Sequence, residues 1–501
     1  MKKLLFFNMI ILFGFHSITY SQNYKRNNNW ITGFAPVVKF AFSPSFVIDT
    51  FSNSYFTTCS SSISDTNGDY QFYCTGYFMM DKLGDIMENG DNINCPKGHI
   101  LSDYYGGSSL FDQTSIILPK KDNTYYVFCT GMSDSVALNY LNHIYTEFDV
   151  LNYSVVDMDS NAGKGKVTVK NKILTENQHY VNCALTAVRH GNGKDWWLVK
   201  SDCWNHRLQL FLVQEDTILG PHYVDITDTG DYCVFDSQLY FSDDGTKFAS
   251  SMYGNWIDSA GFYTYNLNRV DVYDFDRCDG NFTYRNQYVV PFDSTTYTED
   301  DYKMGICFSP NGKLIYMSTR YSIYQIDVED TSTTNGIYIT GPDTVLSNFP
   351  RYSLMASGSD GKLYIGNRNG TRPFMSYIDK PNIRGLGCDF RANGLWQPYT
   401  NLLSPPNMPN YGLGMAPVGG NCWPLAIEQF DNEAIRQLSV YPNPANDKLF
   451  IKTESKEKRE LYNSIGQLLF STSRNEIDVS GMARGIYYLK VGNEVRKIVI
   501  E

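Results

Sequence analysis

The chain lacks the short motifs that mark the commonest enzyme active sites. No His-Glu-x-x-His occurs, which argues against a zincin-type metalloprotease, and no Gly-x-Ser-x-Gly occurs, which argues against an α/β-hydrolase. A Walker-type phosphate loop is missing, and no Cys-x-x-Cys is present to form a zinc ribbon or a thioredoxin-like redox site. Function therefore has to be sought in the architecture and in the two ends of the chain.

Long apolar runs are also scarce. Beyond the N-terminus, no run reaches the ~18 apolar residues that a membrane helix needs, so we expect no transmembrane helix. The N-terminus has two lysines, then an apolar stretch over 4–15 that is too short to span a bilayer, and a small residue, Ser21, before Gln22. This pattern predicts a secretory signal peptide over residues 1–21. The residue directly after the predicted cleavage site is Gln22 and not Cys, which argues against a lipid anchor. We therefore expect a soluble protein outside the cytoplasm.

Positive charge is in short supply. The 42 Lys and Arg residues face 53 Asp and Glu residues, which gives a formal net charge of −11, and most of the acidity lies between the two ends. An acidic surface repels phosphate backbones, so we expect no nucleic-acid partner. Aromatic residues are abundant instead, with 38 Tyr and 30 Phe, and this composition favours β-strands.

A hairpin turn recurs through the middle of the chain. Residues 308–316 read as the end of a strand, a Pro-Asn-Gly turn and the start of another strand, and the Gly supplies the positive φ that such turns need. Related turns recur at a mean spacing of about 59 residues, which is typical of a β-propeller with long loops. We predict that three of them are equivalent, namely Asp244-Gly245, Asn311-Gly312 and Asp360-Gly361.

The predicted fold is all-β, with one β-propeller over residues 24–425. The turn spacing favours seven blades, with six as the alternative. We expect the seventh blade to be shared between residues 30–43 and a strand from the C-terminal end of this region, because a shared blade removes free sheet edges. Long helical periodicity is missing, and a stack of immunoglobulin-like domains fits the turn spacing less well.

This region also resembles a known group of proteins. The segments that carry the resemblance include residues 64–73, 87–91, 188–197, 274–280, 385–388 and 406–414. Together they are similar to the large propeller-like proteins that Bacteroidetes secrete. The resemblance implies a fold and a location at the cell surface, and it implies no particular activity.

The last part of the chain, residues 438–501, reads as a small β-sandwich of about seven short strands, of the immunoglobulin-like kind. It closely resembles the type A C-terminal sorting domain of the type IX (Por) secretion system. The opening Tyr-Pro-Asn-Pro, the Gly-Ile-Tyr-Tyr-Leu segment and the Lys-Ile-Val ending carry this resemblance. Its matching residues are Tyr441, Pro442, Asn443, Pro444, Gly485, Tyr487 and Lys497.

The resemblance implies a route of export. The outer-membrane translocon reads such a domain, which is often cleaved, and the cargo is attached to surface lipopolysaccharide or released. Residues 426–437 would be the linker before it, within reach of a protease. The alternative for residues 438–501 is an adhesive immunoglobulin-like domain with no role in export.

One cluster in the propeller region is a candidate binding site for a glycan or protein ligand. It consists of Arg189, His190, Asp195, Trp196 and Trp197. Adjacent Trp residues in a strand face opposite ways, so one could pack between blades while the other is exposed and stacks on a sugar ring. The alternative is that both indoles pack between blades.

We expect no cofactor, with calcium as the exception to be tested. Asp274, Asp276 and Asp279 could bind calcium at the end of a strand; the alternative is a solvated turn with Arg277 as the local counter-charge. The Asp-rich stretch 65–69 lacks the glycine of a calcium loop and reads as a hairpin turn.

The chain has 11 cysteines, so at least one thiol is unpaired within it. Cys278 and Cys388 lie among polar turn residues and are the better disulfide candidates. Cys74, Cys129 and Cys307 lie within predicted strands, where we expect free thiols that act as small buried hydrophobes.

Two classes of function remain open. The first is a non-catalytic surface module that binds a glycan, a peptide or another surface protein. The second is a propeller hydrolase that uses two carboxylates ~5–9.5 Å apart on a glycan. Several carboxylates at the mouth of the ring, one with a raised pKa, would favour the enzyme. A lining of Tyr, Ser and backbone groups would favour binding.

Overall fold

The computed structural model divides the chain into two compact units, residues 1–422 and 423–501, which we call the body and the tail. The predicted signal peptide (1–21) and the predicted linker (426–437) lie outside the described residues. The structure describes residues 22–32, 37–43, 46–52, 61–94, 113–140, 148–178, 180, 184–202, 207–225, 238–257, 263–290, 305–319, 321–330, 337–340, 352–367, 373–397, 404–416, 422, 439–453, 456–463, 467–492 and 494–500.

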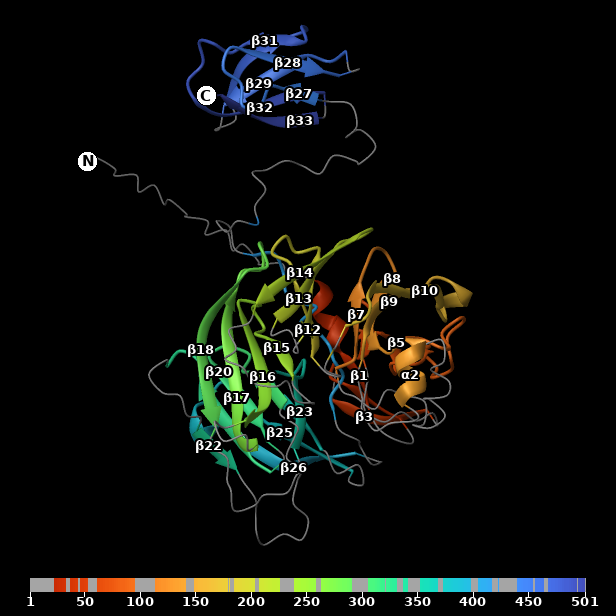
Figure 1. Cartoon of the computed structure of the whole chain (residues 1–501). Coiled ribbons are helices and arrows are strands. Elements are labelled where there is room, and N and C mark those ends of the chain that lie inside the picture. The colour runs from red at the N-terminus through yellow and green to blue at the C-terminus, as the bar shows by residue number, and fades with distance from the viewer. Residues whose placement is uncertain are drawn as a thin grey trace, which may run out of the picture. The chain divides into compact units, whose positions relative to one another are not determined.

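Within these residues, the strands of the body form seven antiparallel sheets, each built from strands that follow one another in the chain (Figure 1). Sheets 1 and 2 have three strands: β1 (Asn29–Thr32), β2 (Val37–Ala41) and β3 (Val47–Ser52), then β4 (Ser61–Ser64), β5 (Tyr70–Cys74) and β6 (Met79–Met80). Sheet 3 contains β7 (Ser115–Pro119), β8 (Thr124–Gly131), β9 (Val150–Asp157) and β10 (Lys166–Thr175). Sheet 4 contains β11 (Leu185–Arg189), β12 (Trp196–Asp202), β13 (Arg207–Val213) and β14 (Ile218–Asp225).

The remaining sheets of the body also have four strands each. Sheet 5 contains β15 (Leu239–Phe241), β16 (Lys247–Ile257), β17 (Tyr263–Phe275) and β18 (Phe282–Val290). Sheet 6 contains β19 (Gly305–Phe308), β20 (Leu314–Ser318), β21 (Ile323–Asp327) and β22 (Ile337–Thr340). Sheet 7 contains β23 (Tyr352–Ser357), β24 (Leu363–Asn367), β25 (Phe374–Ile378) and β26 (Phe390–Trp396). The described helices are short: η1 (Gln22–Asn27), α2 (Asp134–Tyr140), η2 (Asn161–Gly163) and η4 (Gly385–Cys388).

The first strand of each sheet contacts the first strand of the next, so these strands line the centre of the body. They are buried along their length in β1, β4, β11 and β19, whereas the last strands β14 and β26 are largely exposed. A sheet that runs from a buried first strand to an exposed last strand is arranged radially, as in a propeller.

Each sheet shares a hydrophobic core with the next, and the series returns to its start. Trp30 and Phe40 of sheet 1 lie in one cluster with Tyr364 and Met375 of sheet 7, and the Trp30 and Tyr364 ring centroids are 5.4 Å apart. We call this junction the seam. The body is therefore a closed, propeller-like ring of β-sheets. The clusters that join the other neighbours include Ile31 with Tyr73, Phe72 with Tyr125, Leu118 with Leu198, Val199 with Phe241, Val272 with Ile306, and Tyr316 with Ile365.

The prediction of three equivalent turns is confirmed. Each turn connects the first and second strands of one sheet: Asp244-Gly245 in sheet 5, Asn311-Gly312 in sheet 6 and Asp360-Gly361 in sheet 7. The three glycines have φ values of 69°, 67° and 78°, and in each turn the Asp or Asn Oδ1 accepts a backbone N–H from two residues later. The turn chemistry of the sequence therefore fixes the same backbone three times.

The described residues do not form the predicted shared blade. Sheet 1 consists of N-terminal strands alone, and residues 404–416, which end the described body apart from Cys422, belong to no strand and include a turn at residues 411–412. We call residues 404–416 the axial strap. Its backbone groups meet side chains and turns of several sheets instead of a neighbouring strand.

The tail has two sheets that enclose one core. The first contains β27 (Ser439–Tyr441), β28 (Lys448–Lys452) and β31 (Glu476–Asp478); the second contains β29 (Arg459–Asn463), β30 (Leu468–Thr472), β32 (Gly485–Val491) and β33 (Glu494–Ile500). β28 alternates exposed and buried residues, as expected for a strand with one face on a core. The core contains Leu449 and Ile477 from the first sheet with Leu461, Leu489 and Ile498 from the second, which makes the tail a β-sandwich.

Candidate functional site

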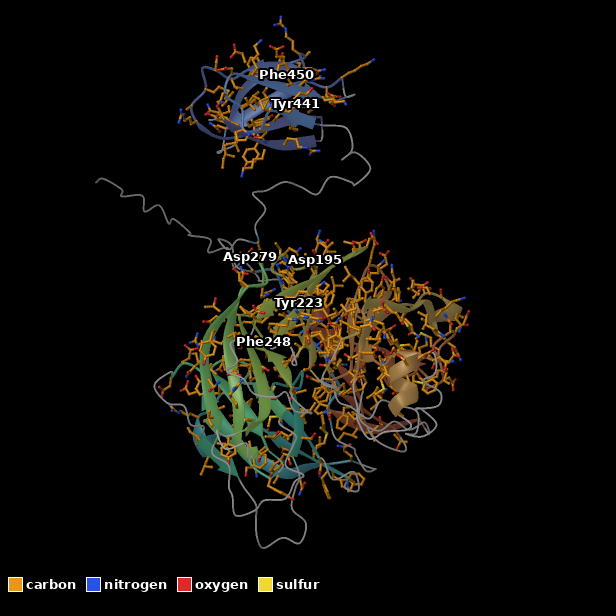
Figure 2. The ribbon with its side chains drawn as sticks, viewed as in Figure 1. Asp195, Tyr223, Phe248, Asp279, Tyr441 and Phe450 are labelled. Atoms are coloured by element: carbon orange, nitrogen blue, oxygen red, sulfur yellow. A yellow bond between two sulfur atoms is a disulfide. The ribbon has the colours of Figure 1, made fainter. Side chains whose placement is uncertain are left out.

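The five candidate binding residues lie together on one hairpin of sheet 4. Arg189 ends β11 and pairs with Trp196 at the start of β12. The turn between them is closed by backbone bonds from the His190 N–H to the Asp195 oxygen and from the Gly193 N–H to the His190 oxygen, both 2.9 Å. Asp195 lies at the same end of the body as Asp279 of the β17–β18 turn (Figure 2).

Both Trp side chains are buried, so the hypothesis of one exposed indole is wrong and the alternative, in which both indoles pack between sheets, holds. Trp196 is 1% exposed and Trp197 is 8% exposed. The Trp197 Nε1–H donates to the Arg277 carbonyl at 2.8 Å, and the His190 ring lies 5.4 Å from the Trp197 ring. The two rings do face opposite ways, but each face is covered by protein, and neither is available to stack on a sugar.

What covers Trp196 is the axial strap. The Tyr411 ring packs edge-on against Trp196, with centroids 5.8 Å apart, and the Arg189 guanidinium lies 4.1 Å from the Trp196 ring centroid. The Arg189 Nη2 also donates to the Tyr411 carbonyl at 3.5 Å. Two residues of the predicted cluster, Arg189 and Trp196, therefore contact a segment of the same chain.

The strap is hydrogen-bonded to the first strands of sheets 3 and 4. At its start, the Asn407 Nδ2 donates to the carbonyls of Ser115 and Leu185, both at 2.9 Å, and these residues begin β7 and β11. Further on, the Tyr411 hydroxyl donates to the Ile117 carbonyl at 2.6 Å. Tyr411 is completely buried, so the strap is an integral part of the interior of the ring.

The strap also contacts the opposite side of the ring centre. Met408 packs against the seam cluster and against the core of sheets 2 to 4. The Asn27 Nδ2 donates to the Pro409 carbonyl at 3.4 Å. The space between the first strands is therefore crossed by polypeptide at these residues.

The strap ends on the turns of sheets 4 and 5. The Arg277 Nη2 donates to the Gly414 carbonyl, and the Ala416 N–H donates to the Gly191 carbonyl at 2.8 Å. A disulfide then joins Cys422 to Cys278 in the β17–β18 turn. The strap is therefore held near its start by Asn407 and at its end by the Gly414 and Ala416 hydrogen bonds and the disulfide that follows.

Two buried arginines, Arg189 and Arg277, lie where the strap ends. Burial lowers the pKa of Arg189 and Arg277 to about 10, and for Arg189 the charges of Arg26 and Arg277 add to the effect. Both stay protonated at neutral pH. Among the described residues, Arg189 and Arg277 form no ion pair, and backbone carbonyls accept their N–H groups, those of Arg189 and His190 for Arg277. Such groups hold a backbone in place and supply no general acid or base at pH 7.

The calcium candidate is not assembled as a site. Asp274 pairs with Arg285 at 2.9 Å, and the Asp276 Oδ1 accepts the Cys278 N–H at 2.8 Å. Arg277 points into the body instead of serving as their counter-charge, which corrects that expectation. Within the described part of the chain, no group of three or more His, Cys, Asp or Glu is placed to hold a metal ion. The Asp65 Oδ1 accepts the N–H groups of residues 67 and 69, which confirms the hairpin turn.

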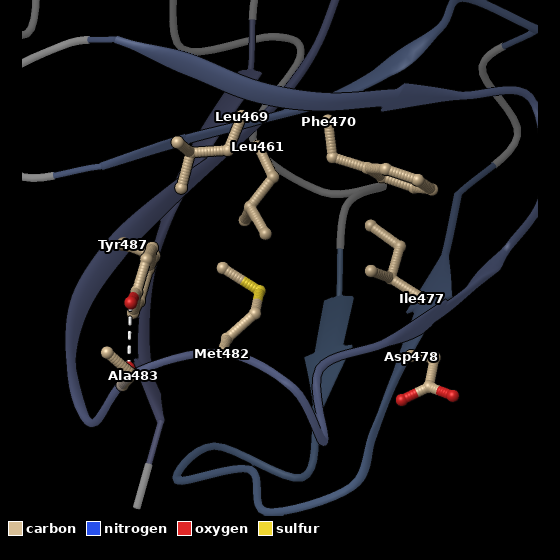
Figure 3. A pocket seen from close by; sticks show the side chains of 8 residues that line it. All are labelled: Leu461, Leu469, Phe470, Ile477, Asp478, Met482, Ala483 and Tyr487. Carbon is tan, nitrogen blue, oxygen red and sulfur yellow. Dashed lines mark hydrogen bonds between the residues drawn. The ribbon is translucent and has the colours of Figure 1, made fainter.

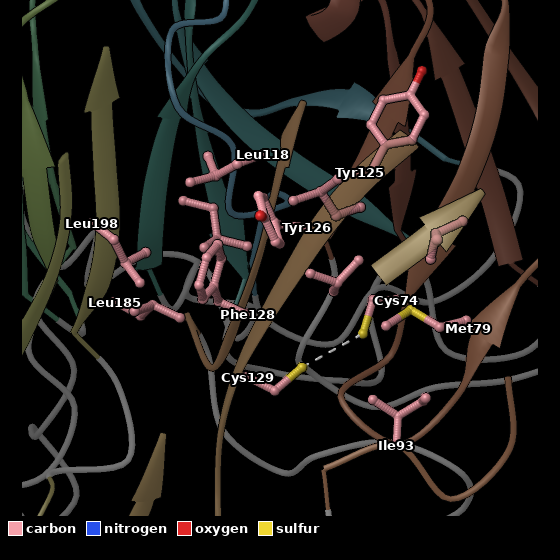
Figure 4. Close-up of a cluster of buried hydrophobic side chains, with 14 of the residues drawn as sticks. Cys74, Met79, Ile93, Leu118, Tyr125, Tyr126, Phe128, Cys129, Leu185 and Leu198 are labelled. Atoms are coloured by element: carbon pink, nitrogen blue, oxygen red, sulfur yellow. Dashed lines mark hydrogen bonds between the residues drawn. The ribbon is translucent and has the colours of Figure 1, made fainter. Parts of the chain in front are cut away.

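The disulfide predictions are half right. Cys278 is bonded to Cys422, whereas Cys388 is a free buried thiol, whose pKa burial raises. Cys74, Cys129 and Cys307 are free and buried, as predicted. The Cys74 and Cys129 sulfur atoms are 4.0 Å apart in the core of sheets 2 and 3 (Figure 4). The other cysteines, 59, 95, 183, 203 and 233, lie outside the described residues.

One carboxyl of the body has a strongly raised pKa. Burial, and secondarily the charge of Asp244, raises the pKa of Asp243 to about 7. Asp243 sits in the turn after β15, and its backbone carbonyl accepts the Asn410 Nδ2 of the strap at 2.8 Å. The carboxylate that acts on Asp243 is that of Asp244, the next residue in the sequence. This arrangement differs from a catalytic pair, in which two carboxylates face each other across a cleft.

The residues expected to carry the sorting signal lie in the tail. Asn443 fastens the opening of the tail to its last strand: its Nδ2 donates to the Lys497 carbonyl and its Oδ1 accepts the Val499 N–H, both at 2.8 Å. Tyr441 is 52% exposed and stacks on Phe450 (Figure 2). Pro442 and Pro444 flank Asn443 in the loop that follows β27, and Gly485 begins β32 opposite Ile500.

The tail also has a cavity of about 330 Å³ beside β30 (Figure 3). The Tyr487 hydroxyl donates to the Ala483 carbonyl at 2.7 Å and so shapes one wall. The lining is otherwise mostly apolar: Leu461, Leu469, Phe470, Ile477 and Met482, with Asp478 at its edge.

The tail is the part of the chain that comparison with known proteins identifies. Residues 439–501 match the secretion system C-terminal sorting domain family, Por_Secre_tail. The sorting domain therefore makes this chain a cargo of type IX secretion, which delivers proteins to the cell surface or beyond. No helix in the described part of the chain is long and apolar enough to span a membrane. The comparison with curated proteins returned no match.

Solved structures similar to the chain are propeller-like and distant in sequence. A periplasmic gluconolactonase of Pseudomonas aeruginosa has a TM-score of 0.40 at 12% identity, covering 75% of this chain and 97% of that one. A putative 6-phosphogluconolactonase of Bacteroides fragilis has a TM-score of 0.39 at 12% identity, with 77% and 96% covered. Hsv2 of Kluyveromyces lactis has a TM-score of 0.35 at 11% identity, with 71% and 90% covered.

The strap was missed as part of the site. Its sequence is rich in Pro, Asn and Gly, has no strand alternation and reads as a loop. A signal was nevertheless available, because Asn407 and Tyr411 are spaced polar and aromatic residues in a long stretch with little charge. Such residues in a predicted loop indicate a segment that is bound rather than solvated.

Proposed function

We propose that this protein is a type IX secretion cargo whose body is a non-catalytic seven-bladed β-propeller that binds a glycan, a peptide or another surface protein. Each of the seven sheets would be one blade. The N-terminal residues 1–21 would direct passage through the inner membrane, and the outer-membrane translocon would then read the sorting domain. After processing, the body would be attached to surface lipopolysaccharide or released.

The observation that carries this proposal is that the sorting-family match coincides with a separate compact unit. The match covers residues 439–501, and the tail has its own hydrophobic core. An independent unit at the C-terminal end of the chain can be read by an export apparatus while the body keeps its own fold. We propose a domain boundary in the linker at 426–437, with the propeller over 24–425 and the sorting domain over 438–501.

The proposed non-catalytic role rests on the strap that crosses the centre of the body. In a propeller, the central opening is the natural place for a small-molecule site, because the sheets converge there. Here the strap crosses that space, and the groups around it are backbone carbonyls, amides and buried guanidiniums. This environment supports binding over hydrolysis, and it directs the search for a ligand to the outer faces of the body.

The alternative is a glycan hydrolase, and the observation that favours it is the raised pKa of Asp243. Its pKa of about 7 suits a general acid. A retaining or inverting mechanism also needs a second carboxylate at ~5–9.5 Å. Its acidic neighbour Asp244 is instead held in its own turn, where its Oδ1 accepts the Thr246 N–H and the Ser242 hydroxyl. We therefore favour the binding module.

Cell fractionation tests the proposed route. A chain that lacks residues 439–501 should pass the inner membrane and accumulate in the periplasm, because the translocon has no sorting domain to read. The wild-type chain should reach the cell surface or the medium. As a matched control, Asn410→Ala alters an exposed Asn of the body and should leave export unchanged. Export of the truncated chain at wild-type levels would show that the tail is an adhesive module instead.

A further inference from the structure

The ring has a joint that its strands do not close. Sheets 1 and 7 come from the two ends of the described body, and no strand is common to them. They meet through side chains: the Tyr364 ring of sheet 7 makes edge contacts with the Trp30 and Phe42 rings at 5.4 and 5.7 Å. One hydrogen bond beside the rings joins the Ser359 hydroxyl to the Asn27 carbonyl at 3.1 Å. Neighbouring sheets of the body all meet through side chains, but sheets 1 and 7 are not consecutive in the chain, so no connecting segment holds them together. The seam is therefore where such a ring opens most readily.

Elsewhere around the centre, side chains tie neighbouring first strands together. The Ser61 and Ser115 hydroxyls are 2.9 Å apart and join sheets 2 and 3. The Gln238 Oε1 accepts the Ile306 N–H of sheet 6 at 2.9 Å, and its Nε2 donates to the Met355 carbonyl of sheet 7 at 2.8 Å. These buried bonds form a belt around the ring centre. Between sheets 3 and 4, it is Asn407 of the strap that reaches a carbonyl on each side.

The strap reaches from this belt to the seam. Met408 packs into the seam cluster, and the Pro409 carbonyl accepts a hydrogen bond from Asn27, next to the Ser359 contact. Asn407 and Tyr411, on either side of these two residues, are bonded to sheets 3 and 4. One short segment therefore holds both the seam and the part of the ring that faces it.

We propose that the axial strap is the latch that closes the ring of the body, and that the Cys278–Cys422 disulfide locks this latch. The strap replaces the shared strand by which a propeller ring is otherwise closed. The disulfide joins residues 144 positions apart, a few residues beyond the end of the strap. It keeps the strap at a high local concentration beside its site, so that a strap that leaves is recaptured.

The lock forms by thiol–disulfide exchange in an oxidising compartment. The Cys278 and Cys422 thiols lose two protons and two electrons as their sulfur–sulfur bond forms, and a disulfide donor is reduced to two thiols. Under a reducing agent the reaction runs backwards, and the strap is then held by its non-covalent contacts alone.

Hydrogen exchange of the full-length chain, read by mass spectrometry, tests the latch. Tyr411→Ala removes the anchor of the strap, and Tyr288→Ala is the matched control. Both Tyr side chains are buried, and each hydroxyl donates to a backbone carbonyl, but Tyr288 lies between sheets 5 and 6. Amides of β1 and β24 at the seam should exchange about tenfold faster in Tyr411→Ala and within about twofold of wild type in Tyr288→Ala. If Tyr411→Ala does not fold, Tyr411→Phe with Asn407→Ala takes its place.

Wild-type exchange at the seam in the strap variant, or equal acceleration in both variants, would overturn the latch. The lock is tested in the same assay with Cys422→Ser. Cys422→Ser alone should change the exchange rate at the seam little. In the double variant with Tyr411→Phe, the acceleration should exceed the product of the two single accelerations, because the disulfide and the Tyr411 contacts each hold the strap when the other is lost. A combined effect equal to the product would show that the disulfide does not act on the strap.

Discussion

Replacing Asn407 by Ala should destabilise the body more than truncation of Asn410, the other Asn of the strap. The Asn407 Nδ2 is the donor for two carbonyls, those of Ser115 and Leu185, and all three residues are buried. A buried acceptor left without a donor costs about 1–3 kcal/mol. Two such acceptors give an expected loss of roughly 2–6 kcal/mol in the free energy of unfolding of the body.

The same strap offers a matched control. Asn410 is exposed, and its Nδ2 donates to the Asp243 carbonyl, which water can reach when the amide is removed. Asn410→Ala should therefore cost about 0–1 kcal/mol. Asn407→Asp should be worse than Asn407→Ala, because a carboxylate would face the two carbonyl oxygens without a proton to donate.

Denaturant unfolding of the body, followed by Trp fluorescence, measures these differences. The expected order of destabilisation is Asn410→Ala, then Asn407→Ala, then Asn407→Asp, with the tail unit unaffected in each variant. Equal midpoints for Asn407→Ala and Asn410→Ala would refute the reasoning, because they would mean that the strap is not held at its buried end.

Two further predictions follow from single groups. Asp243 has a folded-state pKa raised to about 7, so its contribution to stability is full below the ordinary Asp pKa and is lost as pH rises from about 4 to about 7. Asp243→Asn should remove that slope from a plot of Tm against pH, and an unchanged slope would contradict the raised pKa. Trp197→Phe should lower the free energy of unfolding by about 1 kcal/mol more than Trp196→Phe, because only Trp197 donates its Nε1–H, to Arg277. Equal losses in chemical denaturation would contradict this assignment.

The sequence by itself determined the parts that depend on local chemistry. Asp244-Gly245, Asn311-Gly312 and Asp360-Gly361 form the same turn because an Asx side chain followed by a residue with positive φ needs only its immediate neighbours. The tail was readable for the same reason, since its motif and its alternating strands lie within one short stretch. An all-β ring follows from repeating such hairpins.

The tertiary structure alone decided what fills the ring. Asn407 meets Ser115 and Leu185, which are 292 and 222 residues away, and Cys422 meets Cys278 across 144 residues. Such pairings depend on how the sheets curve around their centre, and no local pattern encodes that curvature. The Trp pair shows the same limit: alternation gave the opposite directions of the two rings, but only the closed ring and its strap determined that both faces are covered.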